Sequence, residues 1–135
     1  MTFDIKEYKQ SYLDSARLLV NKMKKILLLG PSIEEIKTFH RLAHSLKSQA
    51  LVMGFQYIGL TGRALEAIFK ELLDKKGIIK IDAENIDIYK KALKSVENSL
   101  DKIEKNDEEA DLTETIKELE EIAGVPVLSL LKLKV

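Results

Sequence analysis

The stretch Phe39-His40-Arg41-Leu42-Ala43-His44-Ser45-Leu46-Lys47-Ser48-Gln49-Ala50 repeats apolar residues at alternating steps of three and four. This spacing is typical of an amphipathic helix, because it keeps one apolar stripe directed at a common core. Outside the stripe, His44 and Lys47 are three residues apart and are therefore neighbours on the helix surface. An imidazole beside an ammonium group is a workable site for carrying a phosphoryl group.

The same alternation extends over residues 36–53 and recurs in other parts of the chain. It covers residues 12–26, 58–72 and 86–103, and a shorter segment covers residues 112–122. Short connections between the early helices favour antiparallel neighbours. The sequence therefore predicts an all-α fold, an antiparallel up-down four-helix bundle with an additional C-terminal helix.

Residues that start or stop helices separate these segments. We expect capping boxes from Ser32 with Glu35 and from Asp111 with Glu114, and Asp82 is expected to cap the fourth helix. Helix ends are predicted at glycines or at cations that favour the negative end of the helix dipole. These ends are Gly30-Pro31, Gly54, Lys75-Lys76-Gly77 and Gly124. The acidic linker at residues 106–110 is predicted to be solvent-exposed.

The composition excludes several classes of protein. Lysine and arginine together number 22, equal to aspartate and glutamate, so no overall charge draws the chain to nucleic acid or an anionic membrane. The absence of cysteine excludes disulfides and thiolate chemistry. No apolar run approaches the roughly 20 residues of a membrane span, and the N-terminus lacks a signal-peptide pattern. We therefore expect a cytoplasmic protein.

The length of 135 residues predicts a single domain. We expect the helical bundle to occupy residues 1–124 and residues 125–135 to form an apolar C-terminal tail. That tail either covers the bundle or provides a segment for self-association or docking.

Helix geometry predicts that His44 is reachable from solvent. At about 100° per residue, its side chain lies roughly 130° from the centre of the apolar stripe. A neutral imidazole has one nitrogen free to attack, so His44 can act as a nucleophile without a separate base. A carboxylate that accepts a hydrogen bond from the other nitrogen fixes the tautomer. Glu66 is the candidate, because it follows the core residue Leu65, and Gly62 lets the two helices approach closely.

These residues resemble the histidine-phosphotransfer (HPt) domain family, in the version found at the N-terminus of the chemotaxis kinase CheA. The family signature is His-Ser/Thr-Leu/Ile-Lys-Gly, followed by a Gly-Phe pair. Here it reads His44-Ser45-Leu46-Lys47-Ser48, followed by Gly54-Phe55. Residues 8–27 and the segment Leu65-Glu66-Ala67-Ile68-Phe69 are also similar to CheA, and the resemblance covers residues 7–122.

The resemblance implies a histidine phosphocarrier in a two-component or chemotaxis-type phosphorelay. In such a carrier His44 accepts a phosphoryl group, Lys47 balances its charge and Glu66 orients the imidazole. The partners are a histidine kinase catalytic domain and a response-regulator receiver domain, whose aspartate takes the phosphoryl group. No cofactor is implied, and the chain has no kinase domain of its own. It is either excised from a longer kinase or a free-standing carrier.

Three positions depart from the family pattern. Ser48 replaces the glycine that keeps the surface open for a partner, and Gln49 is bulkier than the usual small residue. Arg63 either adds positive charge beside His44 or pairs with Glu66 and draws it away. These departures leave an alternative, a degenerate HPt fold that acts as a helical interaction module without phosphorylation.

A partner is expected to dock mainly on the face formed by the first two helices. The docking residues that we predict are His40, Ser48, Gln49, Leu51 and Arg63. His40 and His44 also have a spacing that can hold a metal ion. The sequence suggests no third ligand, so we predict no metal site.

Overall fold

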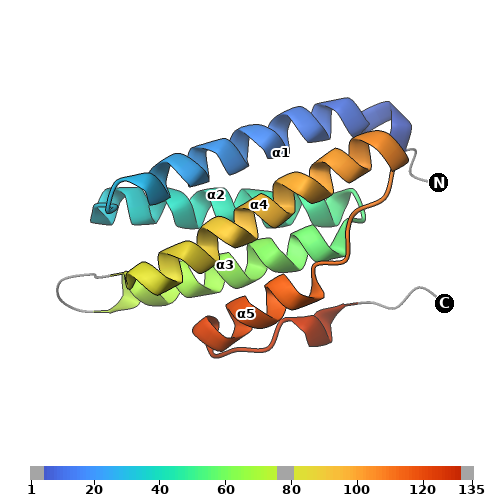
Figure 1. The fold of residues 1–135 in the computed structure, drawn as a ribbon. Coiled ribbons are helices and arrows are strands. Elements are labelled where there is room, and N and C mark those ends of the chain that lie inside the picture. Colours follow the sequence, from blue (N-terminus) through green and yellow to red (C-terminus); the bar gives the residue numbers. More distant parts are fainter. Residues whose placement is uncertain (1–4, 76–80, 132–135) are drawn as a thin grey trace.

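The computed structural model describes residues 5–75 and 81–131, and the regular structure in these ranges is helical. The elements in chain order are α1 (Ile5–Leu28), α2 (Ile33–Val52), α3 (Gln56–Asp74), α4 (Ala83–Asn106), α5 (Thr113–Ala123) and the short 3-10 helix η1 (Leu128–Leu130). Helices α1 to α4 run in alternating directions along the bundle (Figure 1). The predicted all-α bundle with a fifth helix is confirmed.

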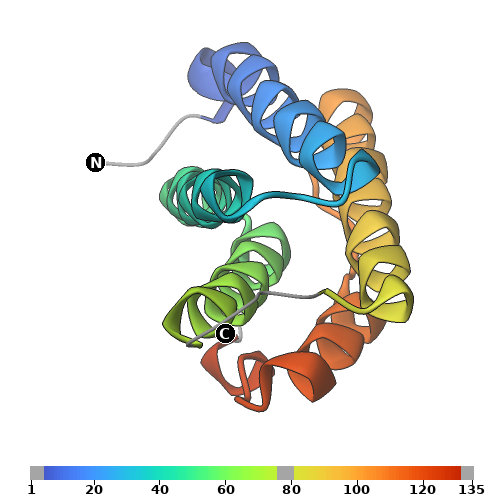
Figure 2. The same ribbon diagram turned by 90° about the vertical axis from the view of Figure 1, so that its left-hand side faces the viewer.

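The four long helices surround one shared core. Seen along the bundle, α1, α2, α3 and α4 follow one another around it, and α5 lies against α3 and α4 (Figure 2). Helix α2 therefore has α1 on one side and α3 on the other. This position matters for the site, because residues on the outer side of α2 can be reached from both neighbours.

An aromatic cluster joins three of the helices through the core. Phe39 of α2 stacks on Phe69 of α3 with ring centroids 4.0 Å apart, and Phe69 meets Tyr89 of α4 edge-on at 5.4 Å. All three rings are buried. Most members of the predicted apolar stripes are buried around them, and those that are only half-buried are Leu19, Met53, Leu72, Ile86 and Ile122.

Several predicted helix boundaries are confirmed. The Ser32 hydroxyl accepts a hydrogen bond from the Glu35 N–H, and the Glu35 carboxylate accepts one from the Ser32 N–H, so the first capping box is present. Gly54 and Gly124 have φ angles of 86° and 71° just beyond α2 and α5. Glycine adopts this left-handed conformation without the steric cost that a Cβ brings.

Two predicted caps are wrong. Asp111 accepts a hydrogen bond from the N–H of Thr113, two residues on, and forms no capping box with Glu114. Short acidic side chains bond readily to the backbone two residues ahead, and this local turn competes with a helix cap. Asp82 precedes α4, but its side chain makes no capping hydrogen bond among the described residues. The predicted end of α3 is present at Lys75, whereas Lys76 and Gly77 lie outside the described residues.

The sequence predicted a solvent-exposed linker between α4 and α5, but this linker is partly buried. Glu109 is half-buried, and its carboxylate accepts hydrogen bonds from the backbone N–H groups of Tyr57 (3.1 Å) and Ile58 (3.0 Å). These N–H groups belong to the first turn of α3, which lacks a capping side chain of its own. The linker therefore fixes the start of α3.

The described part of the C-terminal tail packs against the bundle. Val127 is buried in the core, and its backbone N–H donates to the Glu120 carboxylate of α5 at 2.6 Å. Val125 and Leu130 remain exposed. Residues 132–135, which belong to the predicted tail, lie outside the described residues.

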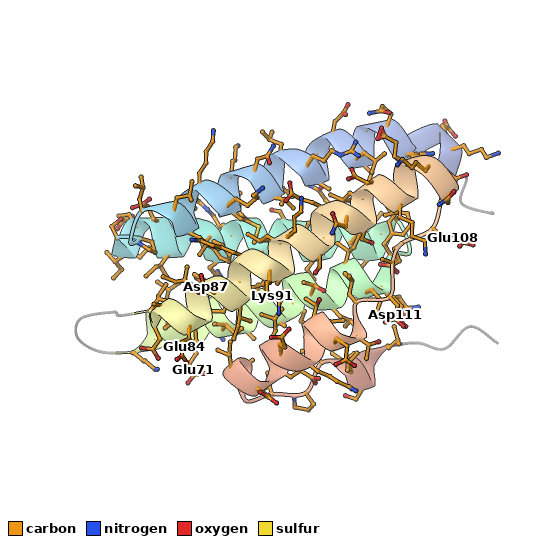
Figure 3. The ribbon with its side chains drawn as sticks, in the orientation of Figure 1. Glu71, Glu84, Asp87, Lys91, Glu108 and Asp111 are labelled. Carbon is orange, nitrogen blue, oxygen red and sulfur yellow. The ribbon has the colours of Figure 1, made fainter. Side chains whose placement is uncertain are left out.

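Charged residues are distributed unevenly over the molecule, although their total charge is balanced. Helices α1 and α2 carry more basic than acidic residues, whereas the linker and α5 are mostly acidic. Ion pairs join α1 to the α4 side, as in Lys24–Glu97 at 3.0 Å. Exposed side chains around α4 are labelled in Figure 3, namely Glu71, Glu84, Asp87, Lys91, Glu108 and Asp111.

Candidate functional site

Helix α2 carries His44 on its outer side. The buried residues of this helix are Ile36, Phe39, Ala43, Leu46 and Ala50, and they face the core. The His44 side chain is 58% exposed, which confirms the accessibility predicted from the helix geometry. A phosphoryl donor and a phosphoryl acceptor can therefore both approach the same ring.

One carboxylate of α3 joins the two polar side chains of α2. Oε2 of Glu66 lies 2.5 Å from Nδ1 of His44, and Oε1 of Glu66 accepts a hydrogen bond from Nζ of Lys47 at 2.7 Å. The side chains of Glu66 and Lys47 are only 17% and 18% exposed. The contact predicted between His44 and Glu66 is present, and each carboxylate oxygen has one partner.

Gly62 explains how α3 comes close enough to α2 for this contact. A Cβ atom at Gly62 would lie 2.9 Å from the backbone nitrogen of Lys47 and 3.2 Å from the carbonyl oxygen of Ala43. A larger residue would therefore collide with the backbone of α2. Glu66 is one turn further along α3 and reaches His44 across the same helix interface.

The geometry sets the tautomer of the His44 ring. An ionised carboxylate only accepts hydrogen bonds, so Nδ1 carries the proton and donates it to Glu66. The other nitrogen, Nε2, keeps its lone pair on the exposed side. Burial opposes ionisation of Glu66, but the hydrogen bonds and charges of Lys47 and His44 outweigh it and hold the pKa of this carboxyl below its usual value.

Lys47 is a neighbour of His44 on the surface of α2, but its ammonium group binds Glu66 of α3. The reason is chemical, since an ionised carboxylate is a stronger acceptor for an ammonium group than a neutral imidazole. Lys47 therefore contacts the ring only through Glu66.

The predicted docking residues are divided between two sides of α2. Arg63 is exposed on α3 and makes no hydrogen bond or ion pair with the other described residues, so it does not pair with Glu66 and draw it away from His44, which was one of the two possibilities. Leu51 is 44% exposed and lies against Gly59 of α3. His40 is half-buried on the same helix as His44.

Ser48 and Gln49 instead line an open groove of about 470 Å³ between α1 and α2. The remaining lining residues are Tyr8, Ser11, Tyr12, Ser15, Val52 and Met53. The Tyr12 hydroxyl and the Gln49 amide oxygen are buried without a hydrogen-bond partner among the described residues. The groove combines apolar walls with a few polar atoms.

Within residues 5–75 and 81–131, His, Cys, Asp and Glu side chains form no group of three or more that could hold a metal ion. In the same ranges, every helix is too short or too polar to cross a membrane.

The model of the Hpt domain family matches residues 7–123, which include His44, Lys47, Glu66, most of α1 and all of α2 to α5. The chain belongs to the Hpt domain family. A comparison with curated proteins gives no match. Hpt domains are histidine phosphocarriers in phosphorelays, where they interact with kinases and response regulators. The resemblance noted in the sequence is therefore confirmed at the level of the family.

The sequence did not reveal two features that support the Hpt site. Glu109 fixes the first turn of α3, the helix that carries Glu66, from about 50 residues away in the chain. The actual partner of Lys47 is also on another helix. Helical spacing identifies neighbours only within one helix. The only feature of the sequence that could have indicated the cap by Glu109 is the acidic character of the linker.

Proposed function

We propose that this Hpt domain accepts a phosphoryl group on Nε2 of His44 and passes it to a response-regulator aspartate in a CheA-type relay. The observation that supports this proposal best is the exposed imidazole whose Nδ1 is bound to Glu66. This contact leaves Nε2 as the free nucleophile. The CheA-type assignment rests on the signature at residues 44–48 and on the segment 65–69.

The geometry favours a direct displacement at phosphorus. The lone pair of Nε2 forms the nitrogen–phosphorus bond, and the bond to the donor's leaving atom breaks with its electron pair on that atom. Nδ1 keeps its proton, so the phosphorylated ring carries a positive charge. Glu66 stabilises that charge because its ionised carboxylate lies 2.5 Å away. Lys47 holds the second oxygen of Glu66 and keeps the carboxylate in place.

We propose further that the partners dock over the outer side of α2 and its neighbours. Exposed apolar side chains are available there, including Leu51 and Val52. The excess of basic residues on α1 and α2 favours the approach of an acidic receiver pocket. In this scheme the receiver aspartate and its bound cation supply most of the catalysis of transfer.

The test is phosphorylation by phosphoramidate, a small donor that needs no kinase. The wild-type chain is expected to gain one phosphoryl group that is labile in acid and stable in base, as measured by intact mass. His44→Gln is expected to remain unmodified. His40→Gln is the matched control, because it removes the other histidine of α2 and leaves His44 in place.

A receiver domain then tests the relay itself. Adding a CheA-type receiver domain to the phosphorylated chain is expected to remove the adduct and to place it on the receiver aspartate. If the wild-type chain takes no phosphoryl group from phosphoramidate or from a CheA-type kinase, the proposal is wrong. The interaction-module alternative then becomes the better description.

A further inference from the structure

Lys47 is bound to Glu66, the carboxylate that holds the Nδ1 side of the His44 ring. Its ammonium group binds Oε1 of Glu66, and Glu66 binds Nδ1 of His44. Nε2 is separated from Nδ1 by the Cε1 atom of the imidazole. If Lys47 left Glu66 to bind a phosphoryl group on Nε2, it would remove one of the two partners of a carboxylate that is only 17% exposed. While Lys47 stays on Glu66, a second cation can balance the phosphoryl charge.

Arg63 is an exposed cation that makes no hydrogen bond or ion pair with the other described residues. It follows Gly62, where α3 lies tightly against the backbone of α2 at Lys47. It also precedes Glu66 by one turn, about 4.5 Å along the helix axis. The Arg63 side chain therefore starts next to the interface between α2 and α3. Glu66 of the same helix already contacts His44 across that interface.

We propose that Arg63 binds the phosphoryl oxygens once Nε2 of His44 is phosphorylated, while Lys47 continues to neutralise Glu66. This inference rests on the proposed function and adds a residue to it. When the nitrogen–phosphorus bond forms and the leaving atom departs with its electron pair, the phosphoryl oxygens retain the negative charge. The planar guanidinium of Arg63 offers two parallel N–H groups to two of these oxygens.

Lys70 is a second exposed cation on α3, one turn beyond Glu66. Arg63 is the better candidate for two reasons. It adjoins Gly62, where the two helices are in close contact, and its guanidinium can bind two oxygens at once, whereas an ammonium group acts as a point charge. Substituting Arg63 and Lys70 one at a time shows which of them acts on the phosphoryl group.

The experiment measures the second ionisation of the phosphoryl group by phosphorus-31 NMR after reaction with phosphoramidate. A nearby cation favours the dianion, so its removal raises the midpoint of the titration. We expect Arg63→Gln to raise the midpoint by about half a pH unit, the coupling typical of an exposed ion pair. Arg63→Lys is expected to raise it less. The matched control is Lys94→Gln, which removes an exposed cation of α4 that has no ion pair within the described part of the chain and is expected to cause no shift.

Each outcome has a distinct meaning. An unchanged midpoint in Arg63→Gln, or a larger shift in Lys70→Gln, overturns the inference and leaves the proposed function intact. A wild-type chain that takes no phosphoryl group overturns both. A shift confined to the Arg63 variants supports both.

Discussion

At the scale of single residues, Glu66 is the centre of the site, because it binds both His44 and Lys47. Its side chain is mostly buried, which restricts its position. Its hydrogen bonds with His44 and Lys47 favour the ionised form. The His44 ring is held at Nδ1 by this carboxylate and is otherwise open to solvent. A fixed tautomer therefore coexists with an accessible nucleophile, which is the combination that phosphoryl transfer needs.

We expect Glu66→Gln to reduce stability in a pH-dependent way. Burial disfavours the ionised form of Glu66, but its hydrogen bonds and charge interactions with Lys47 and His44 hold the folded-state pKa below the ordinary value of 4.5. The ionised carboxylate therefore stabilises the fold above that ordinary value, and this contribution is lost as the pH falls through the lower folded-state pKa. The difference in unfolding free energy between wild type and variant should be largest at neutral pH and should disappear in acid.

Urea unfolding of both proteins between about pH 7 and pH 3 measures this difference. A gap of constant size across that range would show that the carboxylate charge of Glu66 does not contribute to stability. A gap that widens in acid would contradict the direction of the pKa shift.

At the scale of helices, the α2–α3 interface depends on Gly62. We expect Gly62→Ala to destabilise the fold by about 1–2 kcal/mol, because its Cβ would lie 2.9 Å from backbone of α2 that cannot move alone. At Gly59 the close contacts of the added Cβ are with the side chain of Leu51, which is 44% exposed and can rotate, and the Leu51 backbone nitrogen is at an ordinary 3.7 Å. Gly59→Ala should therefore change stability by less than about 1 kcal/mol, helped by the higher helix propensity of alanine.

Thermal or urea unfolding of the two alanine variants makes this comparison direct. The Gly62→Ala protein should also react more slowly with phosphoramidate, because Glu66 is displaced from His44. Equal stability of the two variants would mean that the close approach of α2 and α3 at Gly62 is not required.

The start of α3 gives a second prediction at this scale. Glu109→Ala is expected to cost about 1–2 kcal/mol, because it removes the acceptor for the N–H groups of Tyr57 and Ile58. Glu108→Ala is the matched control, since Glu108 is exposed on the same linker. Urea unfolding should show a loss in the first variant and a change within about 0.5 kcal/mol in the second. Similar losses of stability in the two variants would show that the effect comes from the negative charge of the linker and not from the cap on α3.

The helices themselves were predictable because burial repeats at a regular interval within each of them. Phe39, Ala43 and Leu46 are buried as their spacing required. His44 could be placed on the exposed side for the same reason. The cap from Glu109 and the contact between Lys47 and Glu66 were not predicted, because helical spacing identifies neighbours only within one helix. The His44–Glu66 contact could be predicted because Glu66 follows the core residue Leu65 and Gly62 allows the two helices to approach. Asp111 was misassigned because two local hydrogen-bonding patterns were available to it.

At the scale of the whole molecule, the C-terminal tail completes the core. Val127 is 2% exposed, whereas Val125 is 45% exposed only two residues earlier. We expect Val127→Ala to cost about 1–2 kcal/mol and Val125→Ala to stay within about 0.5 kcal/mol. Urea unfolding monitored by circular dichroism provides the measurement. Equal effects would contradict the packing of the tail on the bundle.

We propose Nε2 of His44 as the phosphoryl acceptor because Glu66 holds Nδ1. The most direct measurement is a long-range proton–nitrogen NMR spectrum of the chain labelled with nitrogen-15, recorded before and after reaction with phosphoramidate. We predict an Nδ1-protonated ring at His44 before the reaction and phosphorus coupling to its Nε2 afterwards. Coupling at Nδ1, coupling at His40 or the absence of any phosphorus coupling would contradict the claim.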